Sequence, residues 1–171
     1  MIAGVGEDLM SADPDEALLR DLAWPLVREF SPAERDELFP LLSAAYFADP
    51  KAFARNGTVG GPLAFGLPEL AVIVTPALLA AMSEVVRYVV TEAALKGVKA
   101  TADGIRRLFG ISRRPDSAPD EDEPLTLTAE QWNQIRRIVE RVARQGGVPA
   151  DQAELIADAV VGQGHRGSGP A

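Results

Sequence analysis

Apolar side chains recur every three or four residues through most of this chain, a spacing that is typical of helices with one buried face. The longest such stretch covers residues 76–109, where Leu78 and Met82 begin an apolar stripe that continues on a rotated face. Gly97 and Gly104 mark positions at which this helix can bend or end. We therefore expect one long central helix over residues 76–109.

Two shorter helices are expected before the central one. Residues 12–30 have helical spacing, and Pro25 interrupts the run, which predicts a kink or a break near Trp24. Residues 31–34 combine a capping serine, a proline at the first helical position and a glutamate three residues after the cap, which predicts a second start. The glycine-rich residues 56–68 match no phosphate-binding loop and are interpreted as a connector.

A pair of helices is expected near the C-terminal end. Thr128 and Gln131 form a capping box ahead of an amphipathic helix, which two glycines and Pro149 separate from a last helix. The predicted fold class is therefore all-α: a helical bundle built around the long central helix, with a linked C-terminal αα-hairpin. The expected organisation is a helical body at 1–110, an acidic, proline-rich linker at 111–127, a hairpin module at 128–161 and a disordered tail at 162–171.

Composition excludes several classes of chemistry. The chain has no cysteine, which excludes disulfides, thiolate zinc sites, iron–sulfur clusters and cysteine nucleophiles. Its single histidine, His165, lies in the glycine-rich tail, and the sequence has no G-x-S-x-G motif. We therefore expect no catalytic residue, no metal and no cofactor. A carboxylate pair formed between two helices is an alternative that stays open.

The first ten residues are not typical of a secretory signal. They carry no lysine or arginine ahead of their apolar residues and no small-residue cleavage pattern. The lack of cysteine agrees with a reducing compartment. We therefore expect a cytoplasmic location.

The net charge of −8 is unevenly distributed, because two acidic flanks enclose a basic middle. Within residues 96–114, Asp103 is the only acidic residue. On a continuous helix, most of the basic residues there would share one face opposite an apolar face, which is typical of helices that bind anionic lipid or an acidic partner. This candidate patch consists of Lys96, Lys99, Arg106, Arg107, Arg113 and Arg114.

Two other interpretations of this region are open. The uncharged residues 70–82 and the helix that follows them can form the buried core, with the cations at its solvated end. The acidic residues 116–123 can also fold back over the basic patch and mask it until a partner competes.

The two helices of the hairpin carry opposite charges. The arginines of the first and the carboxylates of the second are Arg136, Arg137, Arg141 and Arg144, and Asp151, Glu154 and Asp158. Because an acidic recognition helix is unsuited to the major groove, we interpret the pair as an αα-hairpin with a charged exterior, not as a DNA-binding motif. Two short helices rarely bury their own apolar faces, so Trp132, Ile135 and Val139 are expected to anchor a partner, unless they pack onto the body.

These observations favour a non-enzymatic helical adaptor that acts through protein–protein contacts, with another protein or with further copies of itself. The alternative is a peripheral membrane protein that uses the apolar and basic residues 62–114. Nucleic acid is not an expected partner, because an acidic protein repels it at long range.

Overall fold

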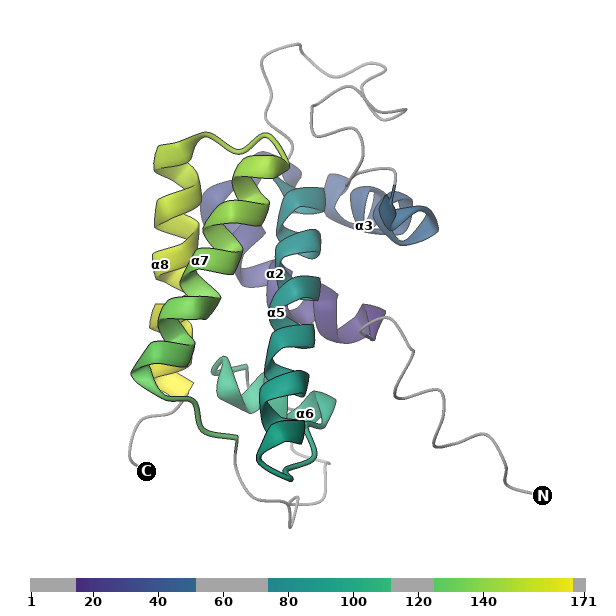
Figure 1. The fold of residues 1–171 in the computed structure, drawn as a ribbon. Coiled ribbons are helices and arrows are strands. Elements are labelled where there is room, and N and C mark those ends of the chain that lie inside the picture. Colours follow the sequence, from purple (N-terminus) through teal and green to yellow (C-terminus); the bar gives the residue numbers. More distant parts are fainter. Residues whose placement is uncertain (1–14, 52–73, 112–124, 168–171) are drawn as a thin grey trace, which may run out of the picture.

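A computed structural model describes residues 15–51, 74–111 and 125–167 of the chain. All regular structure in this part is helical, which confirms the predicted all-α class (Figure 1). The elements are α2 (Glu16–Phe30), the 3₁₀ helix η1 (Pro32–Glu34), α3 (Leu38–Ala48), α5 (Thr75–Leu95), α6 (Ala102–Leu108), α7 (Ala129–Gln145) and α8 (Ala150–Gly167).

Helix α5 is the central element and packs against α2, α3 and α7 (Figure 1). Its side chains Leu78, Leu79, Met82 and Val85 are at most 1% exposed. Burial of each such side chain stabilises the fold by about 1.5–3 kcal/mol. Residues 74–82 are the part of the uncharged run 70–82 that the structure describes, and they belong to the core. This agrees with the interpretation of that run as the buried core.

The long central helix is confirmed, but it ends at Leu95 instead of continuing to residue 109. Gly97 follows with a φ of 74°, in the left-handed region that favours glycine. The N–H groups of Gly97 and Val98 donate to carbonyls of the last helical turn at 3.0 and 2.9 Å, which closes the helix end. A separate helix, α6, starts after Thr101, whose hydroxyl caps it.

Helix α2 continues through Pro25, so the expected kink or break does not divide it. Leu22, Leu26 and Val27 surround the proline and are at most 2% exposed. Packing on this face stabilises the helix against the backbone hydrogen bond that proline cannot make.

Residues 32–34, which follow the predicted cap, form the short helix η1. The glutamate of this motif, Glu34, makes its backbone contacts with the start of α5. Glu34 is 5% exposed, and its carboxylate accepts hydrogen bonds from the backbone N–H groups of Val74 at 2.9 and 3.1 Å and of Thr75 at 3.0 Å. These N–H groups stand at the start of α5, where a helix offers them no carbonyl. The negative charge also complements the positive end of the helix dipole.

The C-terminal hairpin shares one hydrophobic core with the rest of the described fold. Helix α7 begins with the predicted capping box, in which Thr128 and Gln131 exchange hydrogen bonds of 2.8 and 3.1 Å. Helix α8 continues to Gly167, past the expected end at residue 161, so the start of the predicted disordered tail is helical. Most of the predicted linker and residues 168–171 lie outside the described residues.

Candidate interaction surface

The three residues expected to anchor a partner are core residues in this fold. Trp132 is 4% exposed, and Ile135 and Val139 are fully buried. The Trp132 ring meets Phe109 edge to face at a centroid distance of 5.6 Å. Of the two alternatives for these side chains, the structure therefore has the one in which they pack onto the body.

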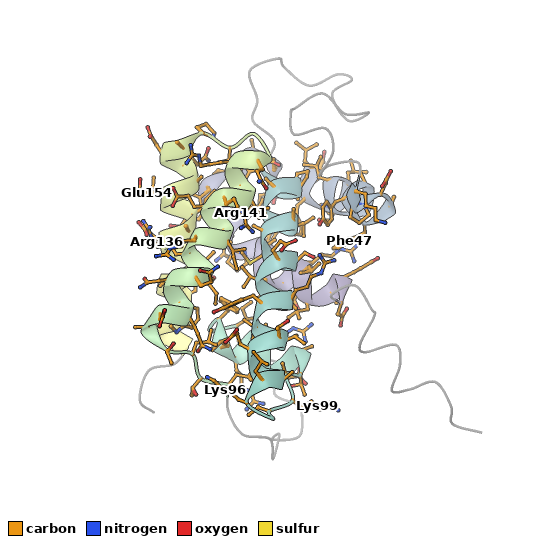
Figure 2. The ribbon with its side chains drawn as sticks, viewed as in Figure 1. Phe47, Lys96, Lys99, Arg136, Arg141 and Glu154 are labelled. Atoms are coloured by element: carbon orange, nitrogen blue, oxygen red, sulfur yellow. The ribbon has the colours of Figure 1, made fainter. Side chains whose placement is uncertain are left out.

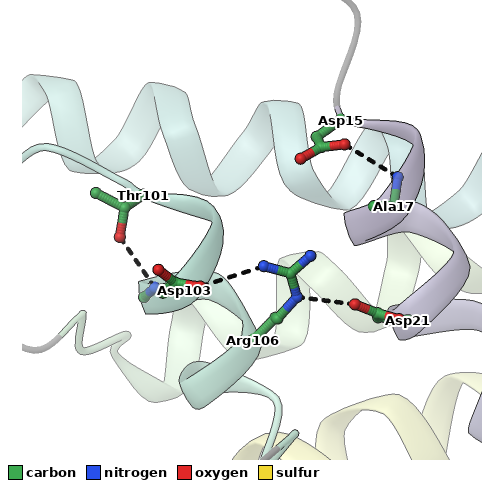
Figure 3. Close-up of polar contacts among 7 residues, drawn as sticks. Asp15, Ala17, Asp21, Thr101, Asp103 and Arg106 are labelled. Carbon is green, nitrogen blue, oxygen red and sulfur yellow. Dashed lines mark hydrogen bonds and ion pairs between the residues drawn. The ribbon is translucent and has the colours of Figure 1, made fainter. Parts of the chain in front are cut away.

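Residues 96–111 do not continue α5, so the single helix on which the basic face was expected is not formed there, and the described cations of the candidate patch fall on separate elements. Arg106, on α6, lies between Asp21 at 2.9 Å and Asp103 at 3.2 Å (Figure 3). These two carboxylates neutralise its charge.

The remaining members of that patch are dispersed or not described. Lys96 stands just past the end of α5, with its Nζ 3.5 Å from Oε1 of Gln131, and Lys99 is exposed on the loop that follows (Figure 2). Arg107 is exposed on α6. Arg113, Arg114 and the acidic run at 116–123, which was expected to mask the patch, lie outside the described residues.

Exposed charges gather instead on the outside of the hairpin, a surface that we call the hairpin face. The arginine row on α7 and the acidic row on α8 are Arg137, Arg141 and Arg144, and Asp151, Glu154 and Asp158. Each row stands on the side of its helix opposite the buried positions, because residues three or four apart share one helical face.

The arginine row is poorly compensated within the chain. No described residue forms an ion pair with Arg137 or Arg141. Arg144 reaches Glu140 at 4.0 Å, and its side chain is 58% exposed. In a protein with a net charge of −8, these cations form a local positive strip.

Arg136 is next to this row on α7, but unlike Arg137 and Arg141 it forms ion pairs with described carboxylates. Its guanidinium lies 2.6 Å from Asp158, 3.6 Å from Glu154 and 3.8 Å from Glu140, on the α8 side of the hairpin (Figure 2). The hydrogen bond and the charge of Asp158, followed by the other two carboxylates, raise the pKa of Arg136 above its usual value. Arg136 therefore joins α7 to α8, while the arginine row faces solvent.

Two open hollows lie on the described surface. The first, of about 570 Å³, lies within the arginine row, and the second, of about 450 Å³, lies between α2, the end of α6 and α8. Their linings are Arg137, Glu140, Arg141, Arg144 and Gln145, and Pro25, Arg28, Glu29, Phe109, Gly110, Ile111 and Gln163. Among the described residues, neither lining contains a serine, threonine, cysteine or histidine. Across residues 15–51, 74–111 and 125–167, no three His, Cys, Asp or Glu side chains are grouped to hold a metal ion.

None of the described helices is long and apolar enough to cross a membrane. No protein-family model, curated protein or solved structure matches the chain. The surface chemistry and the geometry are therefore the observations on which a function can be argued.

The sequence contains the signal for the hairpin face, because the arginines and carboxylates of the hairpin already predict a charged exterior. The spacing of Arg137, Arg141 and Arg144 places them on successive turns of one helical face. The sequence does not show that Arg136 is the described residue that pairs with Glu154 and Asp158 of α8.

Proposed function

We propose that this protein is a non-enzymatic, cytoplasmic interaction protein that binds a protein partner through the hairpin face. The observation that carries the proposal is the pair of exposed arginines, Arg137 and Arg141, with which no described residue forms an ion pair. Partner proteins present carboxylates that match such a strip, and charge complementarity of this kind steers association and fixes its register.

The geometry of the strip favours a protein over a broad polyanion. The exposed carboxylates of Glu154 and Asp158 border the arginine row on the α8 side, so the positive strip is one helix wide. A duplex or a bilayer would bring phosphates against these carboxylates, whereas a single helix can lie along the row. The net charge of −8 adds a long-range repulsion of both polyanions.

The membrane alternative, through residues 62–114, receives less support. The apolar side chains of α5 that it would insert are packed in the core, and Arg106 is neutralised by Asp21 and Asp103. Flotation of the protein with anionic vesicles at low salt is the direct test of that alternative.

Affinity capture from the native cell tests the proposed function. Arg137→Glu with Arg141→Glu reverses two charges of the arginine row, and we expect the captured proteins to be reduced at least about tenfold, because each close charge pair contributes strongly to binding. Arg28→Glu is the matched control, because Arg28 is exposed on α2 and lies outside the hairpin face. Equal capture by wild type and by the double variant would contradict the proposal.

A further inference from the structure

We infer that the partner of the hairpin face is a second copy of this chain, with the arginine row of each copy lying against the acidic row of the other. This inference rests on the proposed function, since it names the occupant of the same surface. Three observations carry it: the spacing of the two rows, the register of the hairpin and an exposed leucine among the carboxylates.

The two rows match when the helices are antiparallel. Along α7 the arginines are separated by four and then three residues, and along α8 the carboxylates are separated by three and then four. A rise of about 1.5 Å per residue converts both into steps of about 6 and 4.5 Å. The second row therefore repeats the first in reverse order.

The register of the hairpin brings the matching residues to the same height. Within one chain, Arg136 lies beside Asp158, Trp132 lies against Gly164, and a short turn joins the last residue of α7 to the first of α8. Height along the hairpin is thereby fixed to within about one residue, or about 1.5 Å. The pairs at equal height are Arg137 with Asp158, Arg141 with Glu154 and Arg144 with Asp151.

Rotation about a two-fold axis parallel to the helices keeps every residue at its height along the hairpin. The pairs at equal height within one chain are therefore also at equal height between two copies. The two hairpins then face each other, and α7 of one copy lies antiparallel to α8 of the other. Arg137 meets Asp158 of the partner subunit, and Arg144 meets Asp151 of the partner subunit. The contact is made twice and closes on itself, which limits the assembly to a dimer.

The acidic row also contains a large apolar side chain. Leu155 is 58% exposed, and it lies four residues after Asp151 and three before Asp158, on the same face of α8. In the dimer this side chain packs against the methylene stems of the arginine row of the other copy. Apolar contact thus accompanies the charge pairs.

Light scattering and sedimentation of the full chain test the inference. We expect a dimer at low salt whose dissociation constant rises as salt is added, because the Debye length falls from about 10 Å at 0.1 M to about 3 Å at 1 M. Arg144→Asp and Asp151→Arg are each expected to weaken the dimer by about tenfold or more. Both changes in one chain exchange the charges and are expected to restore dimerisation.

The restored dimer separates a lost contact from a lost fold, since the exchanged chain contains both substitutions. Asp151 is chosen because no described residue forms an ion pair with it, and Arg28→Asp is the charge-matched control that should dimerise like wild type. A dimer that survives both single variants, or an exchange that fails to restore it, overturns the inference. A chain that is monomeric at all salt concentrations also overturns it, and if capture still depends on Arg137 and Arg141, the proposed function stands without it.

Discussion

Among the glycines compared, Gly164 is the one whose surroundings leave least room for a side chain. A Cβ at this position would lie 2.0 Å from Cη2 of Trp132, a distance that real contacts do not reach. Gly162 is in the same helix, and nothing lies within 4 Å of the Cβ that it would carry. The two glycines are therefore a matched pair that differ in their surroundings.

We predict that Gly164→Ala lowers the free energy of unfolding by about 1–3 kcal/mol, because Trp132 or α8 must move to admit the methyl group. Gly162→Ala should raise it by about 0.5–1 kcal/mol, because alanine loses less backbone entropy in a helix. Urea unfolding at high salt measures both. Equal effects of the two substitutions would show that the contact with Trp132 does not restrict α8.

Tyr88 is a residue whose titration reports on charges from both α5 and α7. Burial, and then the charges of Glu92 and Glu130, raise its pKa above the ordinary value of 10.0. We predict that Glu130→Gln lowers the pKa of Tyr88 toward that value. Ultraviolet absorbance in a Tyr46→Phe background measures it, because Tyr88 is then the only tyrosine.

The raised pKa also fixes the sign of a pH effect. In the folded chain Tyr88 stays neutral to higher pH than in the unfolded chain, so its stabilising contribution is complete below pH 10.0 and is lost as pH rises through the folded value. The free energy of unfolding should therefore fall with pH in this range, and less steeply in Glu130→Gln. The same slope in both proteins would count against the proposed cause.

At the scale of elements, the start of α5 depends on one carboxylate from another helix. We predict that Glu34→Ala lowers the free energy of unfolding by about 2–3 kcal/mol, because it leaves the N–H groups of Val74 and Thr75 buried without acceptors. Glu34→Gln keeps one acceptor oxygen and should cost less. Chemical denaturation followed by circular dichroism measures both.

Glu37→Ala is the control for this prediction, because Glu37 is exposed and its side chain caps no helix. It should change stability by less than about 0.5 kcal/mol. If Glu34→Ala were no more destabilising than Glu37→Ala, the carboxylate would not be the group that holds α5.

The sequence predicts those element boundaries that are encoded locally. Thr128 and Gln131 form their capping box because the interaction spans three residues. The end of α5 was ambiguous, because Gly97 and Gly104 are both helix breakers and only the fold decides that Gly97 takes a positive φ. The role of Glu34 was inaccessible, since its acceptor atoms meet N–H groups 40 residues away.

At the scale of the whole molecule, the sequence shows how many charges the chain carries and where they lie along it. It does not show which of them remain unpaired on the surface. The spacing of the hairpin charges is visible in the sequence, but their pairing is not. Arg106 and Arg136 both follow an apolar residue in the sequence, and each forms an ion pair with at least one carboxylate from another helix. Arg137 and Arg141 form no ion pair with a described residue, and they lie on the side of α7 opposite its buried positions.

The attachment of Glu34 to the first turn of α5 has a consequence for how the gene can change. The carboxylate of Glu34 holds the start of α5 beside η1, so α5 is positioned by a contact that lies outside residues 52–73. Doubling the length of a loop in general costs only about 0.6 kcal/mol of closure entropy. Residues 52–73 are therefore the place where insertions, deletions or a genetically encoded reporter should leave the helical core and the hairpin face intact.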